Sequence, residues 1–324
     1  MQLAEQSSRR EPLSYDVFPT PVESSQQIFG QFDQRYQDAI NAWVSSLRAR
    51  GCPTRAELSK SLNKPVGTDA SVGVGMSDAD KIIVEQLCRE VAQSTKVYFD
   101  PADIPGYKFW EGYQYREKEK AVEECWYRQI GYWIIEDIFK TVQTLNANSA
   151  GVLDAPVKRI VDISFTAATA GSSTGTSQPA TAASAGKPQY VTSFKTGLTL
   201  PLTARVSNDR FDVVHFRLSV IVGAKAVPMF LQELCAGKEH RFKGFQNELP
   251  EEKIFHHNQI TVLKSDFEVV DREDNNNRLY RYGPEGVVKL VLVCEYIFDK
   301  KGYDAVKPAS VQKDLESKIA KPAP

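Results

Sequence analysis

The chain has 324 residues, and its 40 basic and 41 acidic side chains give a formal net charge of -1. A hydrophobic fraction of 42% with 25% charged residues is ordinary globular composition, which excludes a chain that is disordered throughout. The even charge balance argues against broad electrostatic capture of nucleic acid. The 5 cysteines stand singly without a CxxC pair, so zinc-knuckle and thioredoxin-type motifs are excluded.

No run of the sequence approaches the roughly 18–20 apolar residues that a membrane-spanning helix needs. The first residues also lack the apolar segment of a signal peptide. We therefore expect contact with a membrane only through a segment absent from this chain. The protein would be periplasmic and anchored in the inner membrane if the chain is part of a longer protein, and otherwise cytoplasmic.

The N-terminal third predicts an extended leader followed by helices. Residues 1–23 are polar and contain three prolines, and Ser24 and Ser25 can then cap a helix. Its apolar stripe consists of Ile28, Phe32, Tyr36, Ile40, Trp43 and Leu47. A second helix is predicted over 77–93, with Ser77 as its cap and two aspartates in its first turn. Residues 24–114 thus form a helical N-terminal region.

The domain predicted over 115–307 begins with a long helix, from about 115 to 146. Its densest aromatic stripe is formed by Trp126, Ile130, Trp133 and Ile134. Core packing beneath a sheet is one interpretation of this stripe. A share in a subunit interface is the other, because tryptophan is enriched among the residues that dominate binding at interfaces.

The clearest strand signal lies in 211–223. Alternate residues from Val214 to Val222 are apolar, whereas His215, Arg217 and Ser219 fall on the other side, which predicts a strand with one buried and one wetter face. Gly223 ends the strand and an amphipathic helix follows from Pro228.

Further strands are predicted within 155–166, 260–271 and 287–303. Residues 190–206 are either an extra strand or the entry to the main one, and 237–258 are a polar excursion. A Ser/Thr/Ala/Gly/Pro tract at 167–188 is predicted to be a flexible insertion. Residues 308–324 are a frayed tail with at most a short helical turn.

The predicted order from the long helix onward is helix, strand, strand, helix, strand, strand. Two such αββ units predict an α+β fold, a ferredoxin-like αββαββ antiparallel sheet of four strands with two helices on one face.

Nothing in the sequence forms a catalytic, cofactor or metal motif, and we predict no enzyme and no small-molecule substrate. Gly73 and Gly75 lack the third glycine of a dinucleotide loop. His256 and His257 are adjacent and therefore point in different directions on a regular element. Together with the aromatic stripe, His215 and Arg217 are candidates for contact with a partner.

Lys243, Gly244 and Phe245 are similar to the start of the aromatic strand signature of the RNA-recognition motif. The continuation QNELPEE lacks the second aromatic residue and is acidic. A nucleic-acid-binding module that uses a ferredoxin-like sheet is therefore the alternative hypothesis.

Five segments resemble the periplasmic part of PilO-type proteins of type IV pilus and type II secretion assembly platforms. They are YWIIEDIFKTVQTLN, APVKRIVDISF, RFDVVHFRLSVIVGAKAVPMFLQELC, ITVLKSDFEV and VVKLVLVCEYIF, within 126–300. The resemblance implies a non-enzymatic scaffold of an envelope complex. Its ferredoxin-like domain would pair with itself or with a PilN-like protein, without a cofactor.

Overall fold

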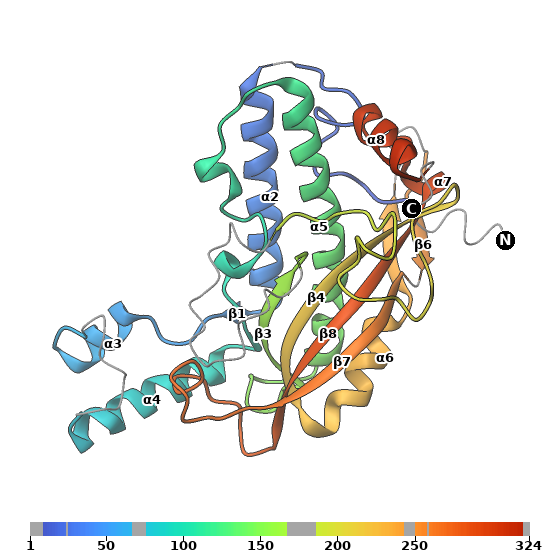
Figure 1. Ribbon diagram of the computed structural model, residues 1–324. Coiled ribbons are helices and arrows are strands. Elements are labelled where there is room, and N and C mark those ends of the chain that lie inside the picture. Colours follow the sequence, from blue (N-terminus) through green and yellow to red (C-terminus); the bar gives the residue numbers. More distant parts are fainter. Residues whose placement is uncertain are drawn as a thin grey trace.

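The computed structural model describes residues 9–23, 25–66, 76–166, 186–242, 250–257 and 259–319 (Figure 1). Its centre is a six-stranded sheet in the order β1-β2-β3-β4-β8-β7. The strands are β1 (Ala49–Arg50), β2 (Val97–Tyr98), β3 (Val157–Ser164), β4 (Phe211–Gly223), β7 (Ile260–Val269) and β8 (Val287–Asp299).

The sheet is mixed, which corrects the expectation of four purely antiparallel strands. β1 pairs with β2, and β2 with β3, in parallel, whereas β3, β4, β8 and β7 pair antiparallel. β1 and β2 come from the region predicted to be only helical. Each has two residues, too few to show the alternation by which a strand is recognised in a sequence.

Three helices build the layer on one face of the sheet: α2 (Gln26–Ser46), α5 (Lys118–Asn146) and α6 (Val227–Cys235). α2 and α5 lie side by side, and α6 packs against α5, β4 and β7 (Figure 1). All three helices were predicted. One continuous core joins them to the sheet through alternate residues of the central strands, such as Phe216 on β4 and Leu292 on β8.

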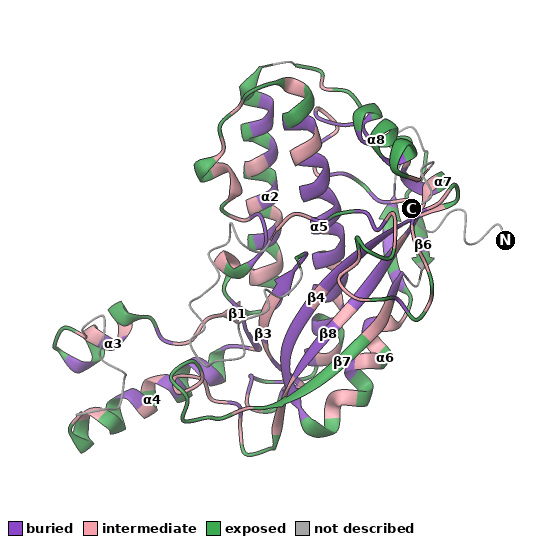
Figure 2. Ribbon diagram, viewed as in Figure 1, coloured by how far each residue is buried: buried purple, intermediate pink, exposed green. Residues whose placement is uncertain are grey.

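The opposite face of β4 is covered, not wetter as predicted. His215 and Ser219 are 3% and 4% exposed, and Figure 2 shows β4 buried along nearly its whole length. Residues 190–207 run over one end, where the Val191 amide donates to the Val213 carbonyl over 2.8 Å. At the other end Ile221 packs with Tyr282. Leu200 and Leu202 in this covering segment belong to no strand and are exposed.

A smaller helical lobe extends from the β1 and β2 edge. It contains α3 (Arg55–Leu62), with a capping box between Thr54 and Glu57, and α4 (Asp78–Ser94), capped by Ser77. Two 3-10 turns, η1 (Pro101–Asp103) and η2 (Phe109–Gly112), lead from β2 to α5, and a third, η3 (Ala224–Ala226), precedes α6. Gly73 and Gly75 lie outside the described residues.

Three peripheral segments have more structure than the sequence suggested. The polar excursion contains a hairpin of β5 (Lys238–Phe242) and β6 (Lys253–His257). The tail predicted to fray forms α8 (Ala309–Ile319) after the short α7 (Lys300–Tyr303), and buries Val311 and Leu315. The leader buries Phe18 completely. Of the insertion at 167–188, only 186–188 are described, and Lys243, Gly244 and Phe245 lie outside the described residues.

Candidate functional site

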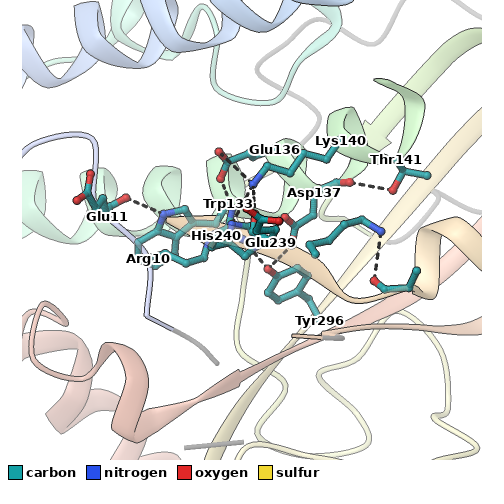
Figure 3. A network of polar contacts seen from close by, with 12 residues as sticks. Arg10, Glu11, Trp133, Glu136, Asp137, Lys140, Thr141, Glu239, His240 and Tyr296 are labelled. Atoms are coloured by element: carbon teal, nitrogen blue, oxygen red, sulfur yellow. Dashed lines mark hydrogen bonds and ion pairs between the residues drawn. The ribbon is translucent and has the colours of Figure 1, made fainter. Parts of the chain in front are cut away.

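A group of ionisable side chains lies inside the molecule, between α5, β5, β8 and the N-terminal segment (Figure 3). Asp137 on α5 is 1% exposed. Its Oδ2 accepts from the Tyr296 hydroxyl over 2.6 Å and from the Arg10 guanidinium over 3.2 Å, and its Oδ1 lies 3.1 Å from His240 Nε2. Arg10 also pairs with Glu136. This buried network therefore joins segments that are as far apart in sequence as residues 10 and 296.

The charges of the buried network compensate one another. Burial alone would lower the pKa of Arg10, but Asp137, Tyr296 and Glu136 raise it above its ordinary value, so Arg10 is a permanent cation. Burial and the nearby charge of Arg10 lower the pKa of His240, which is therefore neutral at pH 7. Lys140 Nζ lies 3.1 Å from His240 Nδ1, so Nδ1 accepts and the Nε2 proton faces Asp137.

Glu136, Asp137 and His240 are the described residues that could together hold a metal ion, since one ligand atom from each lies within 4.8 Å of the others. Arg10 and Lys140 already contact the same three side chains. A divalent ion would have to displace both cations, because like charges at such distances repel strongly. The geometry favours a structural role, in which the ion pairs hold residues 9–14 and β5 against α5.

A second buried network fastens the C-terminal helices. Asp212 at the start of β4 is fully buried, and it pairs with Lys307 over 2.6 Å and accepts from the Tyr303 hydroxyl. The Tyr190 hydroxyl receives a hydrogen bond from Trp126 Nε1 over 3.0 Å. Both networks hold peripheral segments on the core, and neither offers an exposed reacting group.

The aromatic stripe predicted as core or interface lies in the core. Trp126, Ile130, Trp133 and Ile134 are at most 1% exposed. The rings of Trp126 and Trp133 meet edge to face at 6.0 Å, and Trp133 Nε1 donates to the Glu11 carbonyl over 3.1 Å. Contacts within the chain thus occupy these side chains, so they offer no surface to a partner.

The two remaining candidates lie on the opposite face of the sheet from the stripe. His215 is buried, its Nδ1 accepts from the Leu198 amide over 3.1 Å, and burial lowers its pKa to about 4. Arg217 is half-buried, between Ser164 and Val293 in the register of the sheet. Of the six predicted contact residues, only Arg217 therefore keeps a substantial exposed part.

β7 is the last strand at one edge of the sheet, and this edge is exposed. β7 pairs with β8 on one side, and no other described strand pairs with it. Six consecutive residues of this edge, 264–269, are exposed. Phe267 and Val269 are 59% and 95% exposed although they lie on the same face as the core residues of β8. We refer to residues 264–269 as the open edge.

Sequence reasoning missed the buried network and the open edge for different reasons. Asp137 carried a signal, because it is a carboxylate within the apolar side of the long helix, WIIEDIF. Arg10 and His240 carried none, since only the fold brings them to Asp137. The open edge depends on which strand ends the sheet, a property that the sequence of β7 does not contain.

Comparisons with known protein families, with curated proteins and with solved structures identify no match to this chain. Among the described helices, none is both long and apolar enough to cross a membrane.

Proposed function

We propose that this chain is a non-enzymatic interaction protein, a PilO-like scaffold of a pilus or secretion complex in the envelope. The topology agrees with this role: the chain runs α5, β3, β4, α6, β7, β8, with the separate β5-β6 hairpin between α6 and β7. The four strands of the main sheet pair antiparallel in the order β3-β4-β8-β7. With α5 and α6 on one face, this order supports the proposal of a ferredoxin-like unit entered at a helix. Such a scaffold would be periplasmic and held at the inner membrane by a segment outside this chain.

The open edge is the single observation that carries the proposal. An edge strand presents unpaired backbone donors and acceptors, and proteins use such edges to add a strand from a partner. Here the edge also exposes Phe267 and Val269, which a partner strand or helix would bury. The buried networks hold side chains of β4 and β8, and β8 is the strand that pairs with β7.

The partner that fits the open edge best is a second copy of the chain. In a symmetric antiparallel pair centred on Ser265, Lys264 of each copy lies opposite Asp266 of the other, and Leu263 lies opposite Phe267. Lys264 and Asp266 are both about half exposed and 2.7 Å apart within one chain. Centring the pair on Asp266 would instead place two carboxylates face to face, which is unfavourable.

The test is a charge exchange measured by light scattering on a size-exclusion column over a range of concentrations. Lys264→Glu alone and Asp266→Lys alone should each weaken the dimer about tenfold or more, because each places like charges opposite one another. The double variant restores both pairs and should dimerise as the wild type does. Lys313→Glu on the exposed side of α8 is the matched control.

A chain that stays monomeric up to about 1 mM, a limit that still detects weak association, would contradict pairing between copies. Dimers that are insensitive to both single exchanges would do the same. A PilN-like protein that binds the wild type but not Lys264→Glu would identify the other partner that the resemblance implies.

The nucleic-acid alternative has less support. A sheet that binds RNA needs an exposed face with aromatic residues. Here residues 190–207 and Tyr282 cover the face of β4 that bears His215 and Ser219.

A further inference from the structure

A cavity of about 600 Å³ lies between the η2 loop, the first half of α5 and residues 186–187. It belongs neither to the buried networks nor to the open edge. Its volume is within the range of small-ligand pockets, about 300–1,000 Å³. The residues that matter for its chemistry are Phe109, Tyr113, Glu124, Arg128 and Lys187.

Arg128 is the central feature of this cavity. Its side chain is 8% exposed, and its Nε is buried without a hydrogen-bond partner among the described residues. The guanidinium stacks on Phe109 with 4.1 Å between its Cζ and the ring centroid. Stacking satisfies the face of the guanidinium but none of its N–H groups, which lie in the guanidinium plane.

The carboxylate best placed to neutralise Arg128 is engaged elsewhere. Glu124 stands one helical turn before Arg128 on α5, and it pairs with Lys187 over 2.8 Å. No described carboxylate forms an ion pair with Arg128, and burial lowers the pKa of its guanidinium. An arginine that is buried without a counter-ion is unfavourable, so the free protein holds a charge that an anion would compensate.

The backbone makes room for this arginine. Gly106 has a φ of +90°, and a Cβ at that position would lie 2.8 Å from Arg128 Cδ. Any side chain at 106 would therefore displace the guanidinium, and the left-handed φ already favours glycine.

Tyr113, which also lines the cavity, carries a second unsatisfied group. The Tyr113 hydroxyl is buried and has no hydrogen-bond partner in the described part of the chain. The ring centroids of Tyr113 and Phe109 lie 5.1 Å apart, and these two rings form the aromatic part of the cavity wall. Three further cations line it, namely Lys108, Arg116 and Lys120.

We propose that this cavity binds a small organic oxyanion, a phosphate or carboxylate attached to a flat aromatic body. Arg128 would donate two parallel hydrogen bonds to the oxyanion, the geometry that guanidinium groups prefer. Tyr113 would donate a third, and the body of the ligand would lie against the aromatic wall. This inference is independent of the proposed scaffold role, because it uses no residue of the open edge.

The test is a calorimetric titration of the full chain with four probes: phenyl phosphate, benzoate, inorganic phosphate and phenol. Phenyl phosphate or benzoate should bind more tightly than inorganic phosphate or phenol, since only the first two combine an oxyanion with a ring. Which of the two binds more tightly assigns the oxyanion.

Arg128→Met should weaken the preferred probe about a hundredfold and Tyr113→Phe about tenfold, because these variants remove charged and neutral donors respectively. Arg89→Met is the matched control: Arg89 is a more exposed arginine on α4 that pairs with Glu85. Its binding should equal that of the wild type.

A second readout needs no ligand. Without any probe, Arg128→Met should unfold at a higher denaturant concentration than the wild type, because it removes a buried charge that pairs with no described carboxylate. Arg89→Met should not show this gain.

Two results would overturn the proposal. One is a wild type that binds no probe at about 10 mM, the weak end of measurable affinity. The other is probe binding that survives both Arg128→Met and Tyr113→Phe. Tyr113→Phe removes a single oxygen that has no hydrogen-bond partner among the described residues. It should therefore still fold, and it tests the proposal even if Arg128→Met does not.

Discussion

Asp137→Asn tests whether the buried network stabilises the folded state. The change keeps the size of the side chain but removes the charge that faces Arg10, which is only 2% exposed. It leaves Arg10 with Glu136, whose side chain is 21% exposed and lies partly in water. Removing one partner of a buried ion pair costs about 3–5 kcal/mol, because the remaining charge stays buried without full compensation. We expect the free energy of unfolding to fall by that amount.

The assay is urea unfolding followed by tryptophan fluorescence, which is well placed because Trp133 lies beside Arg10. Glu136→Gln is the matched control and should cost only about 1 kcal/mol, since its carboxylate is partly solvated. Adding Arg10→Met to Asp137→Asn should recover part of the loss, because the double variant no longer buries an uncompensated cation.

If Asp137→Asn lowers the free energy of unfolding by less than about 1 kcal/mol, the network does not stabilise the fold more than an ordinary surface ion pair does. Strict additivity of Arg10→Met and Asp137→Asn would refute the pairing on which the estimate depends.

Two further predictions concern the covered face and the C-terminal helix. The pKa of buried His215 is lowered from 6.5 to about 4, so the unfolded chain binds more protons in that window and stability should fall as the pH falls from 6.5 towards 4. His215→Gln should show a smaller fall in urea midpoints between pH 7 and pH 5, and an unchanged fall would assign the effect to other groups. Leu315 is 2% exposed, so Leu315→Ala should cost about 2–3 kcal/mol in the same assay. The neighbouring exposed Glu316→Ala should stay within about 0.5 kcal/mol, and equal losses for the two would mean that α8 does not pack as described.

Long periodic segments could be predicted from the sequence, and the long helix is the clearest case. α5 was expected from about 115 to 146 and runs from Lys118 to Asn146. Its apolar side is visible because a helix repeats over many turns, so single exceptions such as Asp137 do not hide the pattern. β8 was predictable for the same reason, as its core residues alternate from Leu290 to Phe298.

Segments that are held in place by residues far away in the sequence were predicted less well. β1 and β2 are too short to carry a pattern, and α8 shows only Val311 and Leu315 as apolar contacts at helical spacing. The outer face of β4 looked polar because His215 and Ser219 are polar, but the fold covers it with residues 190–207. Polar residues can be buried wherever backbone or side-chain partners reach them, and the local sequence does not contain those partners.

The sequence by itself determined α2, α4, α5 and α6 and the central strands with their order along the chain, because each of these follows from local periodicity and capping. Only the tertiary structure decided which side chains meet. It brought Arg10, Asp137 and Tyr296 into one buried network and left β7 at the open edge. It also placed Arg128 in a cavity where no described carboxylate pairs with it. The physical reason is that burial and charge compensation depend on contacts between residues that are distant in the chain.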